Sequence, residues 1–232
     1  MPDASERDPL VATRRSLHAV AEQVLATALY RRTGRIGLRV APGGFATPVL
    51  DGGDSWTQLE VDGVEIVVRS RDGEHRTRIT TVAGAARAVG LDEPGMPADV
   101  YAPATSVRAA EPLTLHPAAA AELATALAVG DAALERLRAE LVDDDPPIVQ
   151  LWPEHLDAAT TISQVNYGVS PGDDEHPLPY LYVGPWSPPA TDGAFWNEPF
   201  GASRTIDATV SVETAHDFLR EGRRRAIALG SA

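Results

Sequence analysis

Two Asp-Gly pairs, each beside runs of alternating apolar and polar residues, constrain the fold of this chain more than any other feature. Asp62-Gly63 separates the runs 58–61 and 64–69, and Asp72-Gly73 leads into the run 75–80. Asp-Gly readily adopts the left-handed backbone of a two-residue hairpin turn, so the pair is a strong hairpin signal. The sequence therefore predicts a three-stranded antiparallel meander in the first half of the chain.

Two long helices and two shorter ones are predicted around such strands. Asp8-Pro9 is typical of a helix start, and Gly34 is placed to end that helix after an apolar stripe of helical period. A short helix is predicted at 82–89, and the last helix of the chain is predicted at 212–229. A long helix opens at His116-Pro117, and apolar or small residues at alternating four-three spacing form a seam along it. The seam consists of Leu123, Leu127, Gly130, Leu134, Leu137 and Leu141.

Further strands are predicted at 36–40, 148–152, 160–169 and 179–183. The fold class is therefore α+β, with antiparallel β-sheets packed against two long helices and shorter ones. We expect a single compact unit over 1–232. The order of elements also suggests two similar halves, 8–91 and 114–229, joined by the proline-rich connection 92–113.

Composition excludes several classes of protein. The chain has no cysteine, which excludes disulfides and thiolate chemistry, and its 20 basic residues are all arginine, which excludes lysine Schiff bases. The arginine bias indicates a GC-rich bacterial genome. Residues 1–6 do not resemble a signal peptide, and no apolar run approaches the roughly 20 residues of a membrane span. We therefore expect a cytoplasmic protein.

The chain is strongly acidic, with a formal net charge of −13 and a pI near 4.8. A surface of this charge repels phosphate groups, whereas proteins that bind nucleic acid present a basic face. We therefore expect neither nucleic acid nor an anionic membrane surface as a partner.

Several segments resemble a bacterial family known only as a domain of unknown function. They include Trp152-Pro153-Glu154-His155-Leu156-Asp157, Ser170-Pro171-Gly172 and Pro179-Tyr180-Leu181-Tyr182, together with the opening helix around Thr13–His18, Pro42-Gly43-Gly44 and Asp72-Gly73 before Arg76-Thr77. The similarity covers nearly the whole chain. It implies that the chain is one unit, and it implies no activity, because the family has none assigned.

Aromatic residues concentrate in segment 152–204, where polar and ionisable residues lie between them. Eight of the 13 aromatics of the chain fall there: Trp152, Tyr167, Tyr180, Tyr182, Trp186, Phe195, Trp196 and Phe200. Such a mixture suits a small-molecule pocket, for which Trp152, Tyr180, Tyr182 and Trp196 would form walls and Asn166, Asn197 and Arg204 would add polar contacts. The same residues suit a second aromatic core equally well.

His155 and Asp157 are candidates for catalysis or metal binding. In an extended segment their side chains would project from the same face, as two metal ligands would, with Asp174, His176 or Glu198 completing the set. A histidine hydrogen-bonded to a carboxylate without a metal gives the same sequence. The sequence therefore leaves both metal and cofactor unassigned.

Three other patterns bear on chemistry. Glu198 among aromatics could have a raised pKa and act as a general acid or base, or it could equally lie on the surface with its methylene groups against a ring. The loop 173–176 is either a solvated acidic turn or a ligand loop in which His176 titrates near neutral pH. Gly168-Val169-Ser170-Pro171-Gly172 matches a nucleophile elbow in form, but Pro171 has no N–H for an oxyanion hole and a loop follows, so we interpret it as a turn.

Two hypotheses follow for the function. The first is a small-molecule-binding enzyme with general acid–base or metal-assisted chemistry at His155, Asp157, His176 and Glu198. The second is a non-catalytic binding or self-assembly protein, in which the aromatics form a core or an interface and the seam serves homo-oligomerisation. A close polar cluster in a concave pocket would favour the enzyme, and a flat aromatic patch would favour the binding protein.

Overall fold

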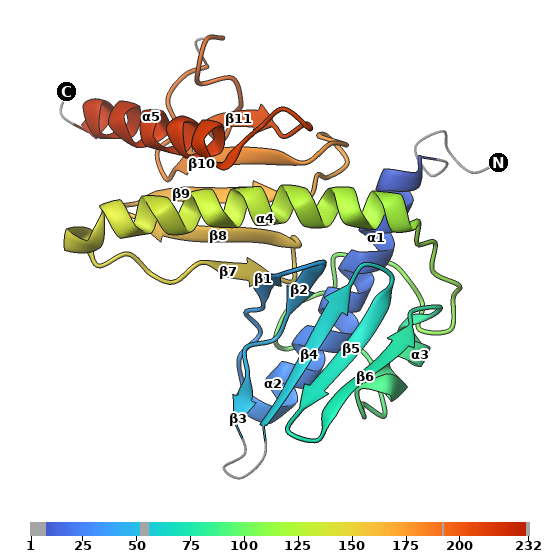
Figure 1. Ribbon diagram of the computed structural model, residues 1–232. Coiled ribbons are helices and arrows are strands. Elements are labelled where there is room, and N and C mark those ends of the chain that lie inside the picture. The colour runs from blue at the N-terminus through green and yellow to red at the C-terminus, as the bar shows by residue number, and fades with distance from the viewer. Residues whose placement is uncertain (1–7, 52–55, 192, 231–232) are drawn as a thin grey trace. The chain divides into compact units, whose positions relative to one another are not determined.

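The structure is a computed structural model that describes residues 8–51, 56–191 and 193–230 (Figure 1). It has an α+β fold with two antiparallel sheets, as the sequence predicted. The chain divides into two compact units, Met1–Thr125 with Leu151–Leu156 and Ala126–Gln150 with Asp157–Ala232. Residues 1–6, on which the signal-peptide expectation depends, lie outside the described residues.

A 25-residue helical stretch opens the first unit. It consists of α1 (Pro9–Val20), the π-helical segment η2 (Ala21–Ala26) and α2 (Thr27–Thr33). The side chain of Asp8 accepts a hydrogen bond of 2.9 Å from the backbone N–H of Leu10, and Gly34 ends the helix in the left-handed conformation. Both predicted helix ends are thus confirmed, whereas the π-helical segment had no signal in the sequence.

The first sheet has the strand order β1-β2-β4-β5-β6, and the short strand β3 also pairs with β4. The strands are β1 (Arg39–Ala41), β2 (Gly44–Ala46), β3 (Leu50–Asp51), β4 (Trp56–Asp62), β5 (Glu65–Ser70) and β6 (Gly73–Arg78). The two predicted Asp-Gly hairpins are confirmed as the β4–β5 and β5–β6 pairs. The strand expected at 36–40 starts only at Arg39, because Leu38 makes an isolated bridge with Leu151 instead.

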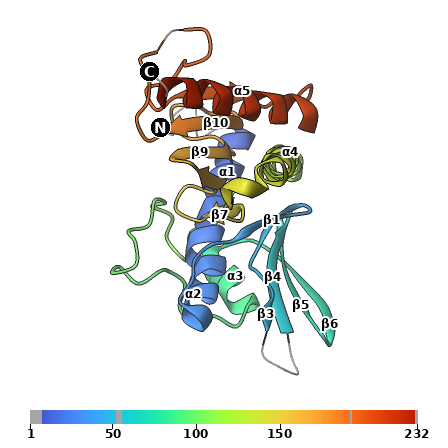
Figure 2. The ribbon, with the colours of Figure 1, turned by 90° about the vertical axis from the view of Figure 1, so that its left-hand side faces the viewer.

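One face of this sheet packs against helices, as Figure 2 shows. Phe45, Val61 and Ile66 lie opposite one another across three strands and are buried. Helix α3 (Val82–Ala88), which confirms the predicted short helix, contacts β5, β6 and η2.

The proline-rich connection 92–113 contains no helix or strand, as predicted, and belongs to the first unit. Polar side chains of the first helix hold it. The carboxylate of Glu22, which is buried, accepts hydrogen bonds of 2.8 and 3.0 Å from the backbone N–H groups of Ala104 and Thr105. Ser16 accepts a further hydrogen bond from the N–H of Thr114, just beyond the connection. These bonds satisfy backbone groups that no regular structure pairs.

The second sheet has the strand order β11-β10-β9-β8-β7. Its strands are β7 (Gln150–Trp152), β8 (Asp157–Ile162), β9 (Val165–Ser170), β10 (Tyr180–Pro185) and β11 (Ala202–Thr205). The single strand predicted at 160–169 is wrong. Ser163 and Gln164 both have positive φ, 51° and 64°, and form a tight turn between β8 and β9. The turn was missed because neither residue is a glycine, asparagine or aspartate.

Helices α4 (Pro117–Glu140) and α5 (Val212–Gly230) confirm the other two helix predictions, and a short 3-10 segment, η3 (Val142–Asp144), follows α4. Two glycines bring these helices close to the second sheet. A Cβ atom at Gly130 would lie 2.3 Å from the side chain of Val169, and one at Gly222 would lie 2.6 Å from that of Val183. Neighbouring residues in the register place Val169 and Val183 on the same face of the sheet, which is therefore the face that α4 and α5 cover (Figure 1).

The seam of α4 is part of the core of this chain. Leu123, Leu127, Leu134 and Leu137 are all buried within the chain, so these leucines are not an exposed surface for the self-association suggested above. By length and composition, α4 could also cross a membrane, and 50% of its most apolar 18-residue window is buried in the protein. Because core helices of soluble proteins pass the same test, it assigns no membrane span.

Replacing Gly130 with alanine should destabilise the protein, although alanine normally favours a helix by about 1 kcal/mol. The added methyl group overlaps the side chain of Val169, and such overpacking costs about 1–3 kcal/mol of unfolding free energy. Urea denaturation of Gly130→Ala measures this loss, and adding Val169→Ala should restore part of it. A Gly130→Ala variant more stable than the wild type would contradict the close packing.

Candidate functional site

The predicted site residues do not all belong to one unit. Trp152 and His155 lie in the first unit, and the second unit holds Asp157, Asn166, His176, Tyr180, Tyr182, Trp196, Asn197, Glu198 and Arg204. Several residues of the second unit are connected by hydrogen bonds.

His155 does not have the geometry predicted for a ligand pair with Asp157. It is exposed and lies in a turn at 153–156, and Leu156 between the two residues is left-handed, with φ 55°. The extended backbone that would project both side chains from one face is therefore absent. Among the described residues, no group of three or more His, Asp or Glu side chains is arranged to hold a metal ion.

His176 joins two loops of the second unit. Its ring Nε2 lies 2.9 Å from Oε1 of Glu198, and the same carboxylate oxygen accepts a hydrogen bond of 2.7 Å from the Ser203 hydroxyl. Its ring Nδ1 lies 3.5 Å from Oδ1 of Asp173, whose other oxygen accepts a hydrogen bond of 2.7 Å from the Tyr180 hydroxyl. We call Asp173, His176, Glu198 and Ser203 the His176 clasp.

The pKa values in the clasp shift in the directions that favour an ion pair. Burial acts to raise the pKa of Glu198, but hydrogen bonds from Ser203 and His176 outweigh it, and the pKa is lowered. Of the two alternatives for Glu198, the raised pKa is therefore wrong. Burial acts to lower the pKa of His176, yet the hydrogen bond and charge of Glu198 and the charge of Asp173 raise it. The pKa of Asp173 is lowered, because hydrogen bonds, first from Tyr180, outweigh the effect of burial.

Tyr182 reaches across the second sheet to Asp157. Its ring lies on Gly168 of the neighbouring strand, where a Cβ atom would come within 2.2 Å of the ring, and its hydroxyl donates to the Asp157 carboxylate on the strand beyond. Burial, followed by the charge of Asp157, raises the pKa of Tyr182 well above its usual value, so the phenol stays a neutral donor. Gly168 was not among the predicted site residues. The only feature of the sequence that could have indicated a role for Gly168 is the aromatic Tyr182, which occupies the paired position of β10.

Asn197 protects the outer edge of the second sheet. Its side-chain Oδ1 accepts a hydrogen bond of 2.9 Å from the N–H of Ser203, and its Nδ2 donates one of 3.2 Å to the carbonyl of the same residue. Ser203 belongs to the edge strand β11, so the carboxamide occupies the hydrogen-bonding position of a further strand. The amide group predicted as a ligand contact is therefore engaged with the backbone.

The remaining predicted residues differ in exposure. Trp196 is buried against Phe195 with ring centroids 5.0 Å apart, and Phe195 packs on Phe218 of α5, so this part of the segment is an aromatic core. Arg204 and Trp152 are exposed. Gly168, Val169 and Ser170 belong to β9, and the chain bends at Pro171, where the N–H of Gly172 donates to the Ser170 hydroxyl at 3.1 Å; no helix follows the serine in the described segment 171–179, whereas a nucleophile elbow requires one.

An aromatic patch lies on the face of the second sheet opposite to α4 and α5. We define it as Thr161, Asn166, Tyr182, Gly184, Trp186 and Phe200. Trp186 is 64% exposed and Phe200 is 37% exposed. The Phe200 ring stands edge-on to Tyr182 at 6.4 Å, and the indole N–H of Trp186 donates to Asn166 at 3.3 Å. Trp186 and Phe200 were not among the predicted binding residues, although the alternation 182, 184, 186 places Trp186 on the same face.

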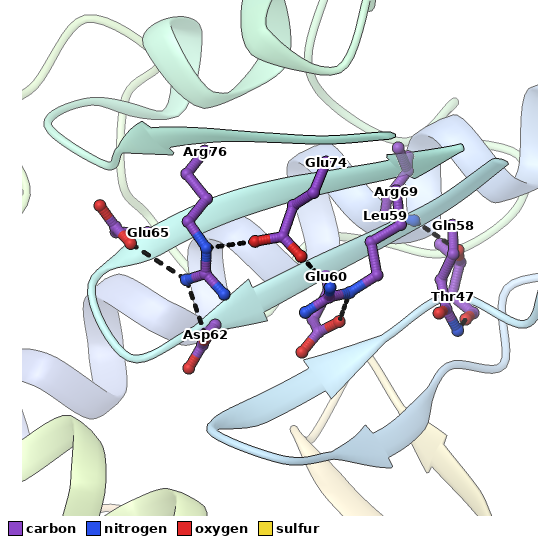
Figure 3. Close-up of polar contacts among 9 residues, drawn as sticks. All are labelled: Thr47, Gln58, Leu59, Glu60, Asp62, Glu65, Arg69, Glu74 and Arg76. Atoms are coloured by element: carbon purple, nitrogen blue, oxygen red, sulfur yellow. Dashed lines mark hydrogen bonds and ion pairs between the residues drawn. The ribbon is translucent and has the colours of Figure 1, made fainter. Parts of the chain in front are cut away.

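The first sheet presents a different, charged surface (Figure 3). Nε of Arg69 lies 2.8 Å from Oε2 of the buried Glu60. Arg69 also forms an ion pair with Glu74, and Glu74 forms another with Arg76. Arg76 further contacts Asp62 at 2.8 Å and Glu65 at 3.1 Å. These residues alternate along β4, β5 and β6, so all lie on the face away from the helices, where cross-strand charge pairs help to fix strand register.

A shallow hollow of about 150 Å3 lies in the first unit. Its lining comprises Ala28, Arg31, Arg32, Val89, Gly90, Leu91 and Asp92, none of which was a predicted site residue.

The geometry defines a protein of two sheet-and-helix units, one with a charged sheet face and one with an aromatic sheet face. No protein-family model, curated protein or solved structure matches this chain. The resemblance to the domain-of-unknown-function family stays a prediction.

Replacing Asn197 should expose the edge of β11. Asn197→Ala removes both hydrogen bonds to Ser203 and should cost roughly 1–2 kcal/mol of unfolding free energy. Asn197→Asp keeps the acceptor and should cost less. Hydrogen exchange of the Ser203 amide should be fastest in the alanine variant. Equal exchange in all three proteins would contradict the role of Asn197 at the edge.

Proposed function

We propose that this protein is a non-catalytic binding protein that holds a cationic, partly apolar polypeptide segment at its aromatic patch. The observation that carries the proposal is the exposure of Trp186 and Phe200 beside Tyr182, on the sheet face opposite to α4 and α5. Large exposed aromatics with polar neighbours are typical of the anchor residues of binding surfaces.

The state of the polar groups supports binding rather than acid–base catalysis. Glu198, Asp173 and the hydroxyls of the two patch-side tyrosines are engaged in hydrogen bonds with one another or with their neighbours. The lowered pKa of Glu198 is the opposite of what a general acid needs near neutral pH. The enzyme hypothesis therefore has less support than the binding hypothesis.

Charge supports a cationic partner. Segment 157–210, which forms the patch and its surroundings, contains seven acidic residues and one basic residue, Arg204, so its net charge is −6. Aromatic ring faces attract arginine and lysine groups, and nearby carboxylates strengthen that attraction. The same charge opposes pairing of the patch with a second copy of itself. A cytoplasmic location, proposed from the composition, is compatible with such a partner.

A labelled ten-residue peptide of alternating arginine and leucine tests this proposal by fluorescence anisotropy. We expect saturable binding to the wild type, a loss of at least tenfold in affinity in the double variant Trp186→Ser, Phe200→Ser, and weaker binding in high salt. The matched control is Trp56→Ser, which removes a 38% exposed tryptophan from the first sheet and should bind as the wild type does.

Two outcomes would refute the proposal. One is a double variant that binds the peptide as tightly as the Trp56→Ser control, because the attraction would then be a property of the overall charge. The other is equal binding of a peptide of alternating glutamate and leucine, because the partner would then not need to be cationic. Circular dichroism of each variant shows that it is folded.

A further inference from the structure

We propose that His176 is the positioning residue of the aromatic patch, and that its protonation fastens the turn that presents Phe200. This inference rests on the proposed function for its binding consequence. The fastening itself concerns the protein without a partner and can be measured separately.

The turn that carries Phe200 is built from four residues, 198–201. Glu198 and Gly201 exchange two backbone hydrogen bonds, of 3.1 and 3.0 Å, which close the turn around Phe200. Gly201 has φ 143°, and a Cβ atom there would lie 2.2 Å from the carbonyl oxygen of Val183. The Gly201 end of the turn is therefore fixed by close contact with β10.

The other end of the turn depends on the His176 clasp. The Glu198 side chain has two described partners, the ring of His176 and the hydroxyl of Ser203. Ser203 belongs to the sheet, whereas His176 belongs to the β9–β10 loop. The His176 ring also faces Asp173 and lies against Tyr180, with ring centroids 4.8 Å apart and the ring planes tilted by 43°. His176 therefore links the turn to a second loop, and the link is ionic only while the imidazole is protonated.

All titratable groups that face His176 among the described residues favour its charged form or are neutral. Asp173 and Glu198 are carboxylates with lowered pKa values, and Tyr180 has a raised pKa and stays neutral. Because the His176 pKa is raised on folding, its stabilising effect is complete below the unfolded value of about 6.5 and is lost as pH rises through the folded value. The ionised carboxylates of Asp173 and Glu198 stabilise the folded protein above about pH 4. This stabilisation is lost as pH falls through their lowered pKa values. The clasp is thus strongest between these limits.

The expected effect on binding has an unusual sign. Deprotonation of His176 makes the patch more negative, and charge alone would then strengthen the binding of a cationic peptide. If His176 fastens the turn, deprotonation instead frees Phe200 and weakens binding. The direction of the pH dependence therefore separates a positioning role from a simple charge effect.

The test begins with NMR titration of the protein alone. We expect the His176 ring to titrate above pH 6.5 and the Phe200 resonances to shift with the same midpoint. In Glu198→Gln the His176 midpoint should fall towards 6.5, and the Phe200 shift at that midpoint should be lost. Phe200 resonances that ignore the His176 titration in the wild type would overturn the proposal, whether or not any peptide binds.

The second measurement repeats the arginine–leucine peptide titration at pH 6 and pH 8. We expect the affinity of the wild type to fall about three- to tenfold between these values, and that of His176→Gln to stay constant. His75→Gln, which removes an exposed histidine of β6, is the matched control and should follow the wild type. An affinity that rises from pH 6 to pH 8 would overturn the positioning role while leaving the proposed function intact.

Discussion

The arrangement of the second unit depends on the close packing of two helices against one face of its sheet. Gly130 of α4 and Gly222 of α5 allow this approach, because any side chain there would overlap Val169 or Val183. Side chains alternate between the two faces of a strand, so helices on the valine face leave Tyr182, Gly184 and their neighbours on the other. The existence of an aromatic patch is therefore a consequence of how the helices pack.

In both units, the sheet face that the helices do not cover carries side chains of a different kind. In the first unit, Glu60, Arg69, Glu74 and Arg76 pair with one another across three strands, so the charges of that face are matched within the sheet. In the second unit the corresponding face carries aromatic rings, with Asp157 bonded to the hydroxyl of Tyr182 and the His176 clasp formed by neighbouring loops and β11. Paired charges disfavour apolar association, whereas exposed rings favour it, which is why the proposed binding surface is the one on the second unit.

The residues of the clasp have the chemistry of an active site, but we propose a structural role for them. His176, Glu198, Asp173 and Ser203 include the residue types of acid–base catalysis. Their pKa values shift in the directions that favour a charged histidine and ionised carboxylates, which is the arrangement of an ion pair. The residue types identify the cluster, and only their mutual distances decide its role.

Local signals in the sequence determined most of the secondary structure. Asp8, Gly34 and the two Asp-Gly pairs act through their own backbone preferences, so their effects were predictable from neighbouring residues alone. The turn at Ser163-Gln164, the protected edge at Asn197 and the ring of Tyr182 over Gly168 had no such signal. They arise because strands distant in sequence pair in one register and bring these side chains together. The sequence determined the elements and the residue types of the site, and tertiary packing decided which of those residues meet.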